Sequence, residues 1–203
     1  MTRPRYAVIP TRDRPDQFAE CLRAIWDQVD HVLVISHHAD YVGHVHAESL
    51  SVIPYDPDLP NISAMWNLGL LEAEMGAYGE PHDVAVLNDD AVVPPDWFDR
   101  ITARMQQHDA AGASGPRGND DTSAEIAGYA FIVAGERGIR ADERLRWWYS
   151  DDAIQRRCET AGGFQIVPGV HVEHLYPNQS TVGELARISA EDRAVYEETY
   201  LAP

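Results

Sequence analysis

Short apolar runs alternate along the chain with segments in which apolar residues recur every three or four positions. The runs are rich in β-branched residues and predict strands at 6–9, 31–36, 50–55 and 83–88. The periodic segments predict amphipathic helices over 15–28 and 62–76. Such an alternation is typical of a mostly parallel sheet covered by helices, in which ligands bind at the carboxyl ends of the strands.

The second half of the chain keeps this pattern, with one interruption. Pro94 and Pro95 precede apolar residues at helical spacing, so we expect them to open a helix. The stretch 110–123 lacks periodicity, is rich in Gly, Ser and Asp, and predicts a mobile loop. After it the sequence predicts a strand at 124–135, a helix at 150–162, a strand at 164–170 and an acidic C-terminal helix or tail.

The length of 203 residues is close to the usual size of one domain, so we expect a single α/β domain over 1–203 with a Rossmann-like sheet. Cys21 and Cys158 fall at apolar positions of predicted helices, which favours small core residues over a disulfide framework or a cysteine-bound zinc site. The sequence holds no run of about 18 apolar residues and no apolar run typical of a signal peptide, which predicts a cytoplasmic protein without a membrane span.

The charge of the chain narrows the classes of partner. A formal net charge of −17 argues against a broad surface for nucleic acids, because binding their backbone requires clustered Lys and Arg. A polyanionic acceptor would need a local basic patch. We expect most of the acidic excess simply to solvate the surface.

The strand predicted at 83–88 runs directly into Asn88, Asp89 and Asp90. Carboxylates at the end of such a strand face the ligand crevice, and Mg²⁺ and Mn²⁺ prefer oxygen ligands. A cation held by Asp90 can bridge the two phosphates of a nucleotide diphosphate. The alternative is a plain turn, since Asn and Asp are common turn formers.

A second acidic pair follows Ser150, which we expect to cap the helix predicted at 150–162. Asp151 and Asp152 then fall in the first helical turn, where the helix dipole stabilises a carboxylate by about 0.3–1 kcal/mol. This stabilisation is sufficient to explain the pair. Asp152 can also act as a general base if an acceptor hydroxyl lies within hydrogen-bond reach.

Two further segments carry candidate chemistry. His171 and His174 follow the strand predicted at 164–170, and a neutral imidazole is a common metal ligand, although either residue can equally be a surface histidine. The loop 10–15 offers amides, a hydroxyl and two guanidinium groups that suit a nucleotide or its phosphates. It can also be a connector stiffened by its prolines, and it lacks the glycine pattern of a P-loop or a dinucleotide site.

Taken in order, these segments resemble family-2 glycosyltransferases of the GT-A fold, from about Tyr6 to Ser180. The opening AVIPTRDRPDQFAECLRAI resembles their first strand and helix, WNLGLLEA their central asparagine-glycine helix, and VAVLNDDAVVPPDWF their aspartate-bearing metal motif. The segment from Gly128 to His174 resembles their acceptor side, with an acidic pair, a basic helix residue, a glycine and a histidine in that order.

The resemblance implies an inverting transfer of a sugar from a nucleotide-diphosphate sugar, with UDP as the expected nucleotide, to an acceptor hydroxyl. It implies Mn²⁺ or Mg²⁺ at the diphosphate, held by Asp90 and His174, and Asp152 or its neighbour Asp151 as the catalytic base. Residues 1–95 would form the donor half, 96–180 the acceptor and catalytic half, and 181–203 a C-terminal helix or tail. The implied donor contacts are Pro10, Thr11, Arg12, Arg14, Asn67, Asn88 and Asp89.

The chain departs from the family pattern at two places. Where acidic residues usually hold the nucleoside after the second strand, it has ISHHAD, which leaves Asp40, with His37 or His38, as substitutes. The metal motif begins with Asn88 in place of Asp, which removes one negative charge. We therefore expect weaker metal binding without the donor, so that metal and donor bind together.

The sequence leaves the acceptor and the oligomeric state open. The acceptor can be a small molecule, a glycan, a protein or a modified DNA base. A nucleotidyltransferase is an alternative, but it would typically need a Gly-rich loop with a basic residue after the first strand, where the sequence has none. A sugar-binding module without turnover is another, and the joint presence of Asp90, Asp152 and His174 argues against it.

Overall fold

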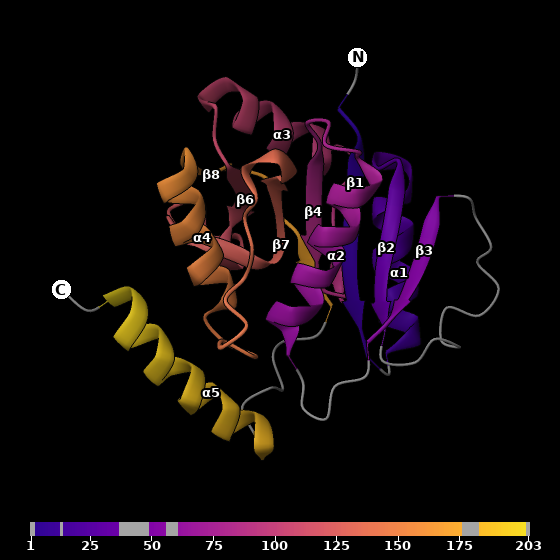
Figure 1. The fold of residues 1–203 in the computed structure, drawn as a ribbon. Coiled ribbons are helices and arrows are strands. Elements are labelled where there is room, and N and C mark those ends of the chain that lie inside the picture. Colours follow the sequence, from indigo (N-terminus) through magenta and orange to yellow (C-terminus); the bar gives the residue numbers. More distant parts are fainter. Residues whose placement is uncertain (1–2, 13, 37–48, 56–60, 176–182, 202–203) are drawn as a thin grey trace.

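The structure is a computed structural model that describes residues 3–12, 14–36, 49–55, 61–175 and 183–201 (Figure 1). Its main sheet has seven strands in the order β3-β2-β1-β4-β7-β6-β8, and only β7 among them runs antiparallel to its neighbours. The predicted class, a mostly parallel sheet flanked by helices, is confirmed. The strands are β1 Arg5–Thr11, β2 His31–Ser36, β3 Leu50–Pro54, β4 Asp83–Leu87, β6 Gly112–Pro116, β7 Ile126–Ala134 and β8 Phe164–Ile166. A separate two-stranded ribbon pairs β5 (Ala91–Val92) with β9 (Glu173–His174).

Helices cover both faces of the sheet because successive strand residues point to opposite sides. On one face, α1 and α3 pack against Ile9, Val34 and Leu87. On the other, α2 and α4 pack against Val8, Ile35 and Val86. The helices are α1 Pro15–Ile25, α2 Ile62–Gly76, α3 Trp97–His108, α4 Ser150–Ala161 and α5 Glu184–Tyr196, with η1 Trp26–Gln28 extending α1, a π-helical turn η5 Glu197–Leu201 extending α5, and short 3₁₀ turns η3 Arg117–Asn119 and η4 Gly135–Arg137.

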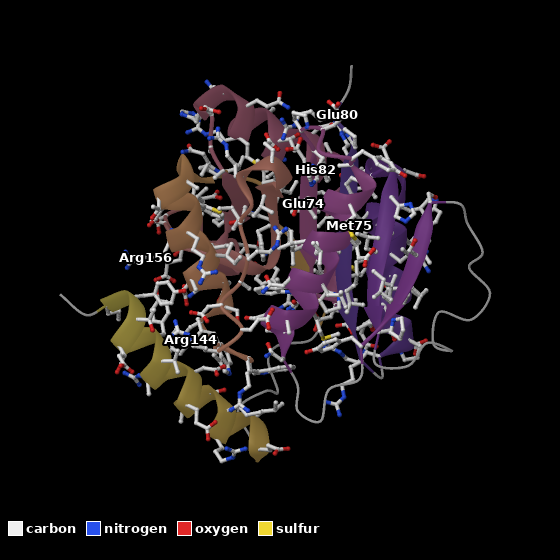
Figure 2. The ribbon with its side chains drawn as sticks, viewed as in Figure 1. Glu74, Met75, Glu80, His82, Arg144 and Arg156 are labelled. Atoms are coloured by element: carbon white, nitrogen blue, oxygen red, sulfur yellow. The ribbon has the colours of Figure 1, made fainter. Side chains whose placement is uncertain are left out.

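The last described helix, α5, lies beside the start of α4 (Figure 1). Tyr196 of α5 stacks on Tyr149, with ring centroids 5.0 Å apart, and packs with Leu145 and Ala153 in a small apolar cluster. Figure 2 shows Arg156 on this side of α4. Among the residues that the structure describes, none of the helices is both long and apolar enough to cross a membrane.

The prediction of a mobile loop over 110–123 is wrong for its first part, because 112–116 form β6 with every residue buried. Small residues are required there by the close approach of other segments. A Cβ at Gly112 would lie 2.9 Å from Cys158 Sγ, and one at Gly115 would lie 2.1 Å from the carbonyl oxygen of Val170. A strand selected for small side chains has the composition of a loop, and the sequence pattern therefore misled the prediction.

Two predicted helix starts also differ from the structure. Helix α3 begins at Trp97, two residues after Pro95. The backbone amide of Trp97 donates a hydrogen bond to the carbonyl oxygen of Pro94. Ser150 is the first residue of α4 and not its cap: the cap position is Tyr149, and the Ser150 hydroxyl donates to the Leu145 carbonyl. The two cysteines are buried and free, as predicted.

The sheet changes direction at β1. From β1 the chain goes to β2 and β3 on one side and returns to β4 on the other. The carboxyl ends of β1 and β4 are therefore neighbours at a topological switch point, where open α/β sheets bind ligands. Thr11 ends one of these strands, and Asn88 follows the other.

Candidate active site

Thr11 and Asp89 join the two strand ends directly. The Thr11 hydroxyl donates to Asp89 Oδ2 at 2.9 Å, and the Arg12 backbone amide also hydrogen-bonds to this carboxylate. Asp89 is 1 % exposed. Burial, opposed by the charge of Arg14 and the Thr11 hydrogen bond, raises the pKa of Asp89 to about 6. At neutral pH this carboxyl group is ionised, but its burial makes the charged form less favourable than it would be in water.

Arg14 contacts both aspartates from the solvent-exposed side of the cluster. Its Nη2 lies 2.5 Å from Asp89 Oδ1, and its Nη1 donates to Asp90 Oδ2 at 2.7 Å. The arginine side chain is 43 % exposed, whereas those of Asp89 and Asp90 are 2 % and 4 % exposed. Arg14 immediately precedes Pro15, which starts α1, so the first turn of that helix fixes where the arginine leaves the backbone.

Asp90 also meets His174, the predicted second metal ligand, although 84 positions separate them in the sequence. His174 Nε2 lies 3.1 Å from Asp90 Oδ1. The β5–β9 ribbon sets this distance by pairing Ala91 with His174, and the Leu175 amide donates to the Asp90 carbonyl. Burial alone would raise the pKa of Asp90, but the His174 hydrogen bond and the charge of Arg14 outweigh it and lower the pKa. The Asp90 carboxyl group is therefore ionised at neutral pH, with Arg14 and His174 as its partners.

Asn88 completes the turn after β4 through its backbone. Its amide donates to the Tyr129 carbonyl at 2.9 Å, and its carbonyl accepts from Cys21 Sγ at 3.3 Å. Asp89 and Asp90 themselves lie in a turn. The turn and the cation-binding interpretations of this motif are thus compatible, because the turn is what directs both carboxylates to the end of the sheet.

A second acidic cluster surrounds Arg117. Arg117 Nη2 donates to Asp151 Oδ2 at 3.0 Å and to Asp152 Oδ1 at 2.9 Å. Burial, followed by the charge of Asp152, raises the pKa of Asp151. Both aspartates lie in the first turn of α4, as predicted. Arg117 was missed from the sequence because it falls in the stretch assigned to a mobile loop.

Gly128 on β7 brings the second cluster against the sheet. A Cβ at this position would lie 2.1 Å from Asp151 Oδ2, so only glycine leaves room for that carboxylate. The next residue, Tyr129, stacks on His174 with ring centroids 4.8 Å apart and an interplanar angle of 12°. Neighbouring residues of one strand therefore contact both clusters. A glycine inside a strand pattern is a known sign of close approach, and this signal was available in the sequence.

The other predicted site residues take different places. The Asn67 amide fastens α2 to a neighbouring loop: it accepts the Ala141 amide at 2.7 Å and donates to Glu143 Oε1 at 2.9 Å. Pro10 is buried within β1. The His171 side chain is half exposed, with Nε2 3.0 Å from Asp121 Oδ1. Asp40 and the histidines beside it, 37 and 38, lie outside the described residues.

A groove of about 430 Å³ lies elsewhere, at the amino ends of β1, β2 and β3. It is lined by residues that include Tyr6, His31, Ser51 and Met75, the last of which belongs to α2 (Figure 2). Since the strands are parallel, this end is opposite to the one that carries Thr11. The groove is therefore separate from the two acidic clusters.

The protein side chains at the first cluster supply only part of the ligands that a metal ion needs. Within the described ranges, no group of three or more His, Cys, Asp and Glu side chains is placed to bind a metal. Asp90 and His174 form a pair of one carboxylate and one imidazole, which suits Mn²⁺ better than Mg²⁺ because Mg²⁺ prefers oxygen ligands throughout. A cation held by this pair would have to complete its coordination with water or with ligand oxygens.

Comparison with known proteins gives the fold a precedent. No protein-family model and no curated protein matches the sequence. Among solved structures, S. aureus TarS 1–349 in complex with UDP-GlcNAc matches with a TM-score of 0.64 and 12 % identity over 97 % of this chain and 73 % of that one. The complex with UDP matches with a TM-score of 0.64 and 12 % identity over 97 % of this chain and 72 % of that one. The longer S. aureus TarS matches with a TM-score of 0.65 and 12 % identity over 97 % of this chain and 44 % of that one. This chain shares the fold of TarS. At such low identity the likeness concerns the fold, which is GT-A-like, as the sequence predicted.

Proposed function

We propose that this protein is a metal-dependent, inverting glycosyltransferase that moves a sugar from a nucleotide-diphosphate sugar, with UDP as the nucleotide, to an acceptor hydroxyl. One observation carries the proposal: adjacent residues of β7, Tyr129 and Gly128, contact two clusters, Asp89–Asp90–His174 with Arg14 and Asp151–Asp152 with Arg117, respectively. The fold adds support, since TarS, which shares it, has been crystallised with UDP-GlcNAc.

The first cluster suits the donor diphosphate. Arg14 offers a guanidinium at the mouth of the site, whose fork geometry matches phosphate oxygens. Asp90 and His174 would hold the metal ion, which supplies Lewis-acid stabilisation of the charge that develops on the departing diphosphate. Thr11 keeps the Asp89 carboxylate in place beside them through its hydrogen bond.

The second cluster suits the acceptor. In a single displacement, the acceptor oxygen forms a bond to the anomeric carbon on the face opposite the diphosphate, the bond from that carbon to the phosphate oxygen breaks, and the hydroxyl proton goes to a carboxylate. We assign that proton to Asp152, with Asp151 as the alternative. Arg117 fixes the orientation of both carboxylates through its hydrogen bonds to them.

A thermal-shift screen tests the donor assignment, because a ligand that binds only the folded state raises its stability. We expect UDP with Mn²⁺ to stabilise the protein more than UDP alone and more than other nucleotide diphosphates. The Asp90→Asn variant should lose the Mn²⁺-dependent part of this shift. Stabilisation by nucleotide triphosphates, with release of pyrophosphate, would instead indicate a nucleotidyltransferase.

Turnover of UDP-sugars tests the base. We expect Asp152→Asn to lower kcat for donor hydrolysis or transfer by about 10²–10⁴-fold while UDP stabilisation is retained. Asp27→Asn is the matched control, since Asp27 is an exposed carboxylate at the far end of the α1 segment. Full activity of Asp152→Asn would remove the assigned base. Binding of UDP-sugars without turnover in the unmodified protein would indicate a sugar-binding module.

A further inference from the structure

We infer that Arg14 is an internal counter-ion of the metal site: it holds Asp89 and Asp90 while the donor is absent, and moves onto the donor diphosphate when the nucleotide sugar arrives. The inference rests on the proposed function and adds an order to it. The metal ion gains full access to its carboxylate only together with the donor.

Every carboxylate oxygen of this pair already has a protein partner. Arg14 contacts Asp89 Oδ1 and Asp90 Oδ2, while Thr11 donates to Asp89 Oδ2. The remaining oxygen, Asp90 Oδ1, faces His174 Nε2. A cation that enters between Asp90 Oδ1 and His174 Nε2 must therefore separate this pair while Arg14 stays on the neighbouring oxygen, and repulsion by the Arg14 guanidinium opposes its binding.

The contact with Asp89 is the weaker half of the Arg14 pairing. Arg14 Nη2 lies only 2.5 Å from Asp89 Oδ1, yet within the described part of the chain that oxygen receives no hydrogen bond of acceptable geometry. The pair is held by charge and not by an aligned donor. An interaction of this kind is lost more easily than a bidentate, hydrogen-bonded arginine–carboxylate pair.

Arg14 is also the member of the cluster that is free to turn outward. Its side chain is 43 % exposed, whereas both carboxylates are almost fully buried. A diphosphate at the mouth of the site offers the guanidinium a second, more highly charged partner without deep burial. Its departure would leave Asp90 with a free oxygen for the metal ion, so donor and metal would strengthen each other's binding reciprocally.

Binding of Mn²⁺ followed by electron paramagnetic resonance tests this inference without any turnover, because only unbound Mn²⁺ gives the sharp aqueous signal. In the unmodified protein we expect weak Mn²⁺ binding that becomes tighter when UDP is added. In Arg14→Met, donor-free Mn²⁺ affinity should rise by about tenfold or more, which corresponds to removal of one nearby positive charge. The effect of UDP on Mn²⁺ affinity should shrink accordingly.

Arg14→Gln repeats the test with a polar side chain if Arg14→Met does not give the circular dichroism spectrum of the unmodified protein. Arg23→Met, an exposed arginine of α1, is the matched control and should bind Mn²⁺ as the unmodified protein does. Unchanged or lower donor-free Mn²⁺ affinity in the folded Arg14 variants would overturn the inference. If UDP still stabilises the protein in that case, the proposed function stands; absence of any UDP binding would overturn both.

Discussion

Asp89 is ionised at a place that solvent hardly reaches. Its pKa of about 6 lies above its ordinary value of 3.8, because burial outweighs Arg14 and Thr11. The folded state therefore binds the proton more tightly than the unfolded chain does. This linkage stabilises the fold fully below about pH 4, and the stabilisation is lost as the pH rises through about 6.

We predict from this linkage that Asp89→Asn stabilises the protein at alkaline pH. The gain in the free energy of unfolding should be about 2–3 kcal/mol at pH 8 and about half as much at pH 5, where the native carboxyl is already largely protonated. Urea denaturation at both pH values measures it. Asp27→Asn should change little at either pH, and a larger gain at pH 5 than at pH 8 would contradict the prediction.

Single residues also show how far sequence reasoning reaches. Asp90 and His174 each follow a strand predicted from the sequence, and the family resemblance implies that they share a metal ion, so their meeting could be anticipated. Arg117 could not, because its importance depends on β6 placing it beside α4. The role of Asn67 as a fastener of the loop at Ala141 and Glu143 likewise depends on a long-range contact that no local pattern encodes.

At the scale of elements, the prediction worked where side-chain chemistry distinguishes a strand from a loop. The apolar β1, β2 and β4 and the periodic α1 and α2 were all predicted close to their observed bounds. The exception, β6, has small residues because Cys158 and the Val170 backbone press against it. Its strand identity is imposed by packing, which a single sequence does not display.

Helix α5 supports the start of α4 through a buried carboxylate. Asp192 is 0 % exposed, and its Oδ2 accepts the backbone amides of Trp147 and Trp148 at 2.6 and 2.9 Å. These two residues directly precede Tyr149, which has a φ of 63° and occupies the cap position of α4. The C-terminal helix thus holds the strained turn from which Asp151 and Asp152 emerge.

We predict that Asp192→Ala destabilises the protein by about 2–4 kcal/mol, since it leaves two partly buried amides without their charged acceptor. Asp192→Asn keeps one acceptor oxygen and should lose less. Urea denaturation compares both variants with Glu191→Ala as the control. Glu191 is a neighbouring surface carboxylate that pairs with Arg146 and Arg187, and its removal should lower the free energy of unfolding by less than about 1 kcal/mol. Equal loss in the Asp192 and Glu191 alanine variants would show that α5 does not support the turn.

For the whole molecule, the alternation of strands and helices was sufficient to predict the class of fold. It did not reveal that β7 runs against its neighbours, nor that this strand carries Gly128 beside Asp151 and Tyr129 beside His174. Strand direction depends on how the segment around β6 returns across the sheet. The spacing of apolar residues along the sequence does not predict the direction in which a strand runs in the sheet.

The net charge of −17 leads to a prediction about the acceptor. Repulsion between this charge and phosphate backbones should prevent binding of short single-stranded or duplex DNA, even at about 50 mM salt, where such binding is strongest. Electrophoretic mobility shift is the measurement, with a basic DNA-binding protein as the positive control. A retarded complex that weakens with added salt would reveal a local basic groove and make a modified DNA base a credible acceptor.

The β5–β9 ribbon has a consequence for the biogenesis of the protein. Asp90 meets His174 only through a contact that spans 84 positions, and the Leu175 amide closes the same ribbon. Such distant contacts form after the local ones, because a long loop must close first. A nascent chain can therefore assemble β1 to β4 while still tethered to the ribosome, but the histidine reaches its aspartate only once the chain has been synthesised 84 positions beyond Asp90.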